Sequence, residues 1–295
     1  MNDSEQINVR SVKDRLKEYK KHPGSFLLLL LVSIAAAISL FVVVYLILYI
    51  LVNGVPNITP ELFAWEYNTD NVSMMPALIN TLIITLITLL IAVPIGIGSA
   101  IYMVEYAKKG NRFVKLVRVT TETLQGIPSI VYGLFGMLLF VVVLHWNYSL
   151  MAGALTLAIM VLPLIMRTTE EALLAVPDSF REGSFGLGAG KLRTVFKIVL
   201  PSAMPGILSG VVLAIGRIVG ETAALIFTAG TVAKVPGGPF DSARTLAVHM
   251  YCLLSEGFYI DQAYATAVVL IVFVLVINGL SGLVAKKIGS NGVKE

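Results

Sequence analysis

The sequence is poor in charge and in cysteine, and both shortages narrow the classes of protein that it can encode. Only 14% of its 295 residues are charged, whereas 57% are hydrophobic. A soluble globule of this size needs more polar surface than that. The composition therefore predicts an integral membrane protein. The single cysteine, Cys252, excludes an internal disulfide and any metal site built from several thiolates.

Other absences exclude further functions. The chain has no G-x-x-x-x-G-K-[ST] motif, so no phosphate-binding loop for ATP is expected in it. His22, His145 and His249 lie far apart and have no Cys or carboxylate at metal-ligand spacing. Ser184 lacks the G-x-S-x-G surroundings of a nucleophile. A net charge of +4 is weak evidence for nucleic-acid binding. We therefore expect a non-catalytic chain that binds no metal, cofactor or nucleic acid itself.

Long uncharged runs predict an all-α protein with six transmembrane helices. The first run covers residues 26–52, and the second ends at Val104 after passing through Pro94. Residues 123–166 carry no formal charge, and this run is too long for one crossing of about 20 residues. Residues 145–148 divide it into the third and fourth spans, because Trp and Tyr favour the membrane interface. The fifth and sixth spans cover about 202–231 and about 262–285.

Basic residues are confined mainly to alternate connections, and this sets the predicted orientation. Lys and Arg precede the first span, and they recur after the second and fourth spans. The connections after the first and third spans contain none. Loops rich in Lys and Arg stay on the cytoplasmic side. We predict a multi-pass protein of the cell membrane with both termini in the cytoplasm. Residues 1–25 are predicted to form a cytoplasmic amphipathic segment in contact with membrane lipid.

One cytoplasmic connector is too long to be a simple turn. Residues 169–201 are predicted to form two short helices, broken at Pro177 and by a glycine-rich run. A spaced pattern follows the first helix: Glu182-Gly183-Ser184, then Gly188, then Ile198, Leu200 and Pro201. This pattern resembles the EAA signature of ABC importer permeases. Gly183 and Ser184 replace the two alanines of that signature but keep the side chains small.

The resemblance implies that a short coupling helix in this connector docks in a groove on a partner ATPase. Small residues let the two backbones approach, while Arg181 and Glu182 offer polar contacts at the rim. Gly188 would let the chain turn out of the helix. The predicted docking residues are Arg181, Glu182, Gly183, Ser184 and Gly188. The alternative is a helix-turn-helix linker that lies on the membrane.

The fifth span contains two charged residues, Arg217 and Glu221, four positions apart. In a continuous helix this spacing places them on one face. An ionisable group at this depth is costly, so both should face the bundle interior or a water-filled path. We predict that Arg217 helps an oxyanion across while Glu221 holds the guanidinium in place. The alternative is that the two charges only neutralise each other.

The third span begins with residues that weaken a helix. Gly126 and Pro128 interrupt it, and freed backbone groups in a membrane are tolerated only beside protein or water. A broken helix lining the pathway through Gly126, Pro128, Ser129 and Tyr132 is one interpretation. A proline kink with glycines for helix packing is the other, and the two are compatible. Glu122 is expected to be an interfacial partner of Arg118.

Together, the elements GIPSIVYGLFG and RIVGETAAL and the EAA-like connector resemble the phosphate-specific ABC importer permeases of the PstA type. The resemblance implies a type I importer (MetI-like) permease fold over residues 71–287. Residues 26–70 would supply the first transmembrane helix and an external loop, and residues 288–295 a cytoplasmic tail. Implied partners are a PstC-type permease, a PstB-type ATPase dimer that binds ATP and Mg, and a PstS-type extracytoplasmic binding protein.

Two rival functions remain open at this stage. One is a permease for another oxyanion, sulfate or molybdate. The other is an ion-coupled secondary carrier, in which Arg217, Glu221 and Glu122 would form a relay. The sequence does not assign a role to Cys252 or to residues 233–261, whose helical part, about 243–254, would either rest on the membrane or meet the binding protein.

Overall fold

The computed structural model describes residues 23–108 and 110–291, and every regular element in these ranges is helical. This confirms the predicted all-α class. The longer helices are α2 (Pro23–Gly54), α3 (Met75–Ile101), α4 (Arg112–Gln125), α5 (Ser129–Gly136), α6 (Leu150–Leu174), α7 (Asp178–Gly186), α9 (Leu200–Val219), α11 (Leu246–Glu256) and α12 (Ile260–Asn291). The amphipathic segment predicted over residues 1–25 lies almost entirely outside the described residues, as does the end of the 288–295 tail.

Shorter elements connect these helices. They are α8 (Lys191–Thr194), α10 (Ala223–Ile226), the 3₁₀ turns η2 (Val55–Asn57) and η3 (Pro60–Phe63), and the π-helical segments η4 (Tyr102–Tyr106), η5 (Met137–Val143) and η6 (Val195–Val199). Three of the longer helices, α3, α5 and α9, are thereby extended at one end by a π-helical segment. Such segments are rare and often occur at functional sites.

Five helices within the described ranges are long and apolar enough to cross a membrane, and a sixth crossing is reached if one bent pair counts as a span. That pair is α4 with α5–η5, bent by 105°. The bend lies between Gln125 and Ser129, where Pro128 has no amide hydrogen and disfavours helical geometry at Ile127. The predicted interruption of the third span is therefore confirmed.

The chain divides into two compact units, residues 1–52 and 53–295. The described part of the first unit is a single apolar helix, α2 up to Val52, along which the rings of Phe41, Tyr45 and Tyr49 contact one another in sequence. The second unit includes the loop at 53–70, which the sequence had grouped with the first span. Its Leu62 is buried against Met74, so this loop is packed into the second unit.

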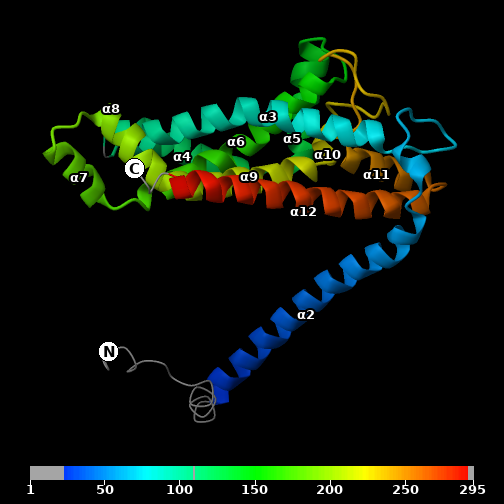
Figure 1. Ribbon diagram of the computed structural model, residues 1–295, viewed down its shortest axis with the longest axis horizontal. Coiled ribbons are helices and arrows are strands. Elements are labelled where there is room, and N and C mark those ends of the chain that lie inside the picture. Colours follow the sequence, from blue (N-terminus) through cyan, green and yellow to red (C-terminus); the bar gives the residue numbers. More distant parts are fainter. Residues whose placement is uncertain (1–22, 109, 292–295) are drawn as a thin grey trace. The chain divides into compact units, whose positions relative to one another are not determined.

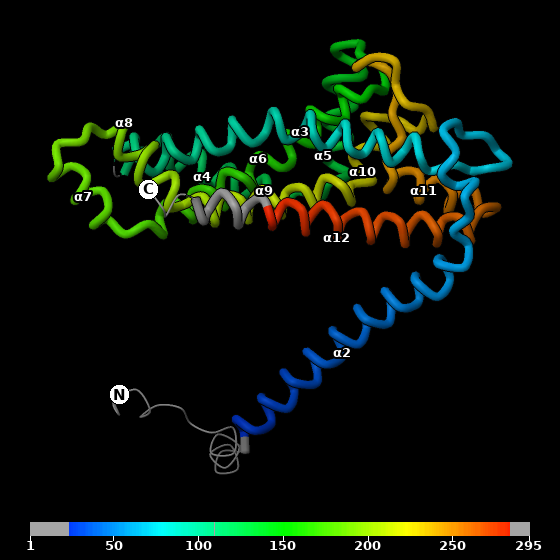
Figure 2. The backbone as a smooth tube through the Cα atoms, in the orientation of Figure 1, coloured from blue at the N-terminus to red at the C-terminus, as the bar shows by residue number. Residues whose placement is uncertain are grey.

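In the second unit α3, α6 and α9 lie side by side, and α12 packs against α9 (Figures 1 and 2). Small residues permit the close approach. A Cβ on Gly96 of α3 would lie 2.7 Å from a side-chain carbon of Ile165, and one on Gly206 of α9 would lie 2.7 Å from Ala172. Close packing of small residues is a main source of helix association within a membrane.

The two ends of this bundle differ. One end carries α7 and α8, and we call it the α7 end; the other carries η3 and α11, and we call it the α11 end (Figure 1). Helix α11 overlaps the helix predicted at about 243–254, and Val248, His249 and Cys252 are buried inside the unit. Much of this segment is therefore core and is not free to lie on a membrane surface.

Candidate functional site

The connector at residues 169–201 folds as the sequence predicted. Helix α7 follows Pro177 and begins with Asp178, whose carboxylate is favourable at a helix N-terminus. It ends at Gly186, and Gly188 then adopts a φ of +82°, a conformation that costs glycine little. Gly190 precedes α8. The two short helices, the break at Pro177 and the turn at Gly188 are confirmed.

One side of helix α7 faces the bundle, and the other side is exposed. Arg181 points inward, with only 14% of its side chain exposed, and pairs with Glu105 of η4 at 2.7 Å and with Asp178 at 3.1 Å. The hydroxyl of Ser184 also faces inward and lies 2.8 Å from that of Thr194. Arg181 is thus not the rim contact that the sequence suggested, because its guanidinium is occupied within the chain.

The outward side of α7 is apolar and has small residues. Glu182 is exposed, and a Cβ added to Gly183 or Gly186 would meet nothing within 4 Å. Phe185 is 47% exposed and Leu187 is 91% exposed. Sequence reasoning missed these two side chains, although two large apolar residues in a polar connector were a usable signal. Exposed apolar groups next to small residues suit a helix that inserts into a groove.

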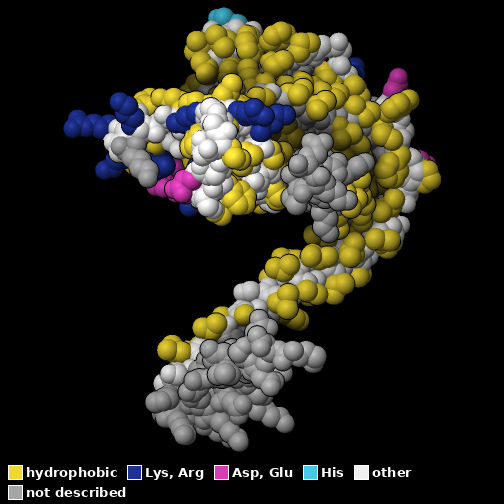
Figure 3. Space-filling model, turned by 60° about the vertical axis from the view of Figure 1, so that its left-hand side comes forward, with side chains coloured by type: hydrophobic (Ala, Val, Ile, Leu, Met, Phe, Trp, Pro, Cys, Tyr) yellow, Lys and Arg dark blue, Asp and Glu magenta, His cyan; other side chains and the backbone are white. Residues whose placement is uncertain are grey.

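Figure 3 shows Lys and Arg gathered at the α7 end of the second unit. Basic residues at this end come from three helical regions: Arg112, Lys115 and Arg118 on α4, Lys191 and Arg193 on α8, and Lys197 on η6. Arg118 pairs with Glu170 of α6. The expected pairing of Arg118 with Glu122 is therefore wrong, since α6 supplies a carboxylate that is nearly buried.

Arg217 and Glu221 do not share a continuous helix. Helix α9 ends at Val219, so Arg217 lies in its last turn, whereas Glu221 follows the end and caps α10 by accepting a hydrogen bond from the Ala224 amide at 3.0 Å. A cation at a helix C-terminus and an anion at a helix N-terminus are each stabilised there. The expectation that Glu221 holds the guanidinium is thus not met: across residues 23–108 and 110–291, no hydrogen bond or ion pair joins the two side chains.

The end of α9 lies near two other polar groups. Arg217 is half-buried and within electrostatic range of Tyr132, whose hydroxyl donates to the Leu124 carbonyl at 2.9 Å. Asn278 of α12 faces Gly216, and its Oδ1 is buried without a partner among the described atoms. The structure thus brings together the predicted residues Arg217 and Tyr132, and it adds Asn278. A single Asn in an apolar span was the overlooked signal.

The broken third span packs against α10. A Cβ on Gly133 would lie 2.8 Å from the Ala224 backbone, so the glycine allows contact between α5 and α10. Gln125 donates to the Pro163 carbonyl at 3.0 Å, which satisfies a backbone acceptor inside α6. Gly126 and Pro128 are exposed, and Ser129 is half-buried. The helix is therefore broken as expected, and Gly133 serves packing, while the pathway-lining role of these residues stays a prediction.

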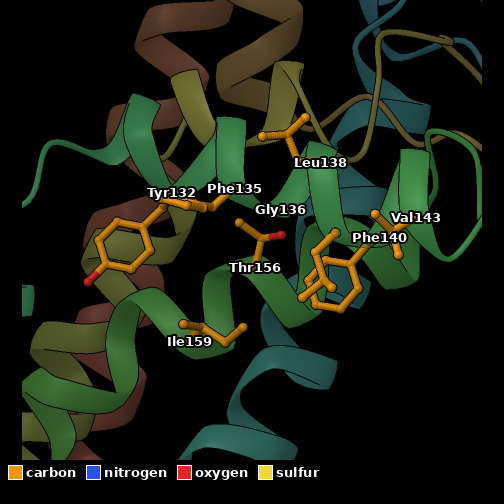
Figure 4. A pocket seen from close by; sticks show the side chains of 9 residues that line it. Tyr132, Phe135, Gly136, Leu138, Phe140, Val143, Thr156 and Ile159 are labelled. Atoms are coloured by element: carbon orange, nitrogen blue, oxygen red, sulfur yellow. The ribbon is translucent and has the colours of Figure 1, made fainter.

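An apolar cavity of about 370 Å³ lies between α5–η5 and α6 (Figure 4). Its walls include Tyr132, Phe135, Phe140 and Ile159. The only hydroxyl besides that of Tyr132 belongs to Thr156, which donates to the Ala152 carbonyl. The described residues that line this cavity include no positively charged side chain.

A buried polar cluster closes the α11 end. Arg244 donates to the Thr231 carbonyl at 2.6 Å, lies over the Tyr67 ring and approaches His249 Nδ1 at 3.4 Å. Asn80 of α3 donates to the carbonyls of Lys234 and Arg244. Burial, and secondarily the charge of Arg244, lower the pKa of His249 to about 4. The loop after the fifth span is therefore held against α3 by the hydrogen bonds of Asn80.

No group of His, Cys, Asp or Glu suited to hold a metal ion occurs among the residues that the structure describes. The cysteine is buried, and burial raises the pKa of its thiol. Its reactive thiolate form is thereby disfavoured.

A bundle of membrane-spanning helices, with the short helix α7 exposed at one end and the half-buried Arg217 inside, is the arrangement expected of a transport permease. The chain belongs to the family of binding-protein-dependent transport system inner membrane components, whose sequence pattern matches residues 92–290. It is a multi-pass protein of the cytoplasmic membrane.

Individual relatives extend the match along the chain. The probable ABC transporter permease protein YqgI of Bacillus subtilis is 35% identical over 88% of this chain and 95% of its own length. The phosphate transport system permease protein PstA of Haemophilus influenzae is 32% identical over 89% of this chain and 94% of its own length. Among solved structures, a chain of a bacterial alginate ABC transporter superposes with a TM-score of 0.68 at 16% identity, covering 92% of this chain and 98% of that chain. This likeness shows the fold, which is that of a type I ABC importer permease.

Proposed function

We propose that this chain is the permease subunit of an ATP-driven importer that moves inorganic phosphate across the cytoplasmic membrane. Relatives that match nearly its whole length include a phosphate transport permease. The observation that carries the proposal is Arg217, a half-buried cation at the end of α9 whose charge is not neutralised by Glu221. A guanidinium offers parallel hydrogen bonds that match a tetrahedral oxyanion.

In this proposal the energy comes from another subunit. A partner ATPase dimer of the PstB type binds ATP and Mg and receives α7 in a surface groove. A second, PstC-type permease completes the pathway, and a PstS-type binding protein delivers phosphate on the extracytoplasmic side. Closure of the ATPase dimer moves the α7 end and switches the pathway between inward-facing and outward-facing states. Both termini of the chain lie in the cytoplasm.

Reconstitution tests this function. The chain, a second permease and the ATPase are placed in lipid vesicles, and uptake of labelled phosphate is measured with binding protein and ATP. We expect uptake to require ATP and to resist competition by sulfate and molybdate. Stimulation by sulfate or molybdate alone would assign a different oxyanion, and uptake driven by an ion gradient without ATP would identify a secondary carrier.

A further inference from the structure

The docking helix α7 is joined to the rest of the chain by short non-helical connectors on both sides. Residues 175–177 precede it and residues 187–190 follow it. Gly188 has a positive φ, and a Cβ on Gly186, Gly188 or Gly190 would meet no atom within 4 Å. Such connectors constrain the orientation of α7 weakly. Side-chain contacts must therefore define how α7 sits on the bundle.

Arg181 supplies most of those contacts. Its Nε and Nη2 both donate to Glu105 Oε1, at 3.1 Å and 2.7 Å. The other Nη2 bond goes to the Leu173 carbonyl at 2.9 Å, and Nη1 donates to the Val176 carbonyl at 2.8 Å and to Asp178 at 3.1 Å. A guanidinium has five N–H donors. Each of them has an acceptor here, and the acceptors belong to the end of α6, to the connector at 175–177, to α7 and to η4.

Glu105 connects this network to a helix that is distant in the sequence. It lies 76 positions before Arg181, in the π-helical segment η4 that ends α3, and only 8% of its side chain is exposed. A second contact runs in parallel, since Lys191 of α8 lies 5.1 Å from the centre of the Tyr106 ring. The α3 end is therefore held to both helices of the connector, although no short stretch of chain joins them.

Burial separates this ion pair from ordinary surface pairs. Arg167 and Glu171 also form an ion pair near the α7 end, but their side chains are 51% and 64% exposed. Exposed pairs contribute little to stability, whereas removal of one member of a buried, hydrogen-bonded pair leaves an uncompensated charge. Loss of one member of the Arg181–Glu105 pair is thus costly, and the Arg167–Glu171 pair is a natural control.

We propose that Arg181 and Glu105 form a clamp that carries movement of α7 directly into α3, as a route additional to the covalent links through α6 and α9. The inference rests on the proposed function, because the movement originates in the ATPase that α7 docks on. In the clamped unit, α7 and the end of α3 move together. Arg181 and Glu105 are positioning residues and do not touch phosphate.

A distance measurement on the assembled transporter tests the clamp without altering it. The single native cysteine is replaced (Cys252→Ser), and spin labels are attached at the exposed positions Ser179 of α7 and Tyr102 of η4. We expect this distance to be the same with and without ATP. A reference pair, Ser179 with Asp261 at the α11 end, is expected to change with ATP.

The outcomes distinguish failure of the proposed clamp from failure of the proposed transport function. A change of the Ser179–Tyr102 distance with ATP, while the reference pair also responds, would overturn the clamp alone. A reference pair that does not respond to ATP would overturn the proposed function. In the Glu105→Gln variant, we expect the Ser179–Tyr102 distance to broaden and to shift with ATP.

Transport per ATP gives a second readout. Glu105→Gln removes the charge but keeps the shape, and Arg181→Lys keeps the charge but loses the fork of donors. We expect both variants to co-purify with the ATPase and to hydrolyse ATP, while phosphate moved per ATP falls about tenfold. Glu171→Gln, the matched control, should keep the wild-type ratio. A wild-type ratio in Glu105→Gln, or loss of ATPase binding in both clamp variants, would refute transmission through this pair.

Discussion

At the scale of single residues, the main finding is that opposite charges of the fifth span are stabilised separately. Arg217 lies at the C-terminal end of α9 and Glu221 at the N-terminal end of α10, where helix dipoles favour each sign. Neither side chain neutralises the other. The guanidinium therefore retains donors for an anion, which a self-contained ion pair would lack.

Replacement of Arg217 tests this arrangement. We expect Arg217→Ala to leave the assembly with the ATPase intact and to reduce phosphate uptake at least about tenfold, because a charge-assisted, bidentate contact is lost. Arg217→Lys should recover part of the uptake, since it restores the charge without the fork. Uptake is measured in reconstituted vesicles. Wild-type uptake in Arg217→Ala would contradict the assignment.

The lowered pKa of His249 predicts that the stability of the fold depends on pH. Its pKa is held at about 4 in the folded chain, against 6.5 for an unperturbed histidine. Between these values the unfolded chain binds a proton that the folded chain does not, so lowering the pH through this window destabilises the fold. Thermal unfolding of the purified protein at about pH 7 and about pH 5 measures the effect. His249→Gln should show a smaller drop, and an equal drop would exclude His249 as its cause.

At the scale of helices, the sequence predicted what depends on local signals. Pro177 and the glycine run correctly placed α7 and α8, and Gly126 with Pro128 correctly placed the break in the third span. The rotation of α7 about its axis was not predictable, because it depends on Glu105, which lies far away in the sequence. The end of α9 at Val219 was also missed, although Gly220, which caps it, was a usable local signal.

The outward side of α7 provides the next prediction. Glu182→Lys should weaken ATPase association, because reversing a charge at the edge of an interface replaces a favourable contact with repulsion. Leu187→Asp should weaken it as well, since Leu187 is 91% exposed and would be desolvated on docking. Co-purification with the ATPase measures both effects. Co-purification unchanged in both variants would argue for a linker that lies on the membrane.

At the scale of the whole molecule, composition and charge distribution were sufficient for the membrane class and the approximate spans, whereas the permease fold was expected from the resemblance to a known family. Two features of the α11 end were not predictable. The loop at 53–70 packs through Leu62 into the second unit, and Arg244 is buried without a carboxylate partner in the described part of the chain. Both depend on segments that are distant in the sequence and that show no helical periodicity of their own.

The orientation of the chain in the membrane follows from its charge pattern and is directly testable. In a Cys252→Ser background, a cysteine at Ser179 should react with an impermeant thiol reagent only from the cytoplasmic side. A cysteine at Asp261 should react only from the extracytoplasmic side. Labelling in intact cells and in inverted vesicles distinguishes the two sides, and the reverse pattern would invert the predicted topology.

The fully occupied guanidinium of Arg181 has an evolutionary consequence. Since its donors bind both side-chain and backbone acceptors, a lysine at this position loses several bonds at once, whereas Glu105 accepts through only one oxygen within the described part of the chain. Position 181 should therefore accept almost no substitution in a saturation mutagenesis screen for phosphate-limited growth. Position 105 should accept aspartate at most, because an amide removes the charge that pairs with Arg181. Chains in which arginine 181 has been lost should also have lost the acid at 105, because a buried carboxylate without its cation is unfavourable.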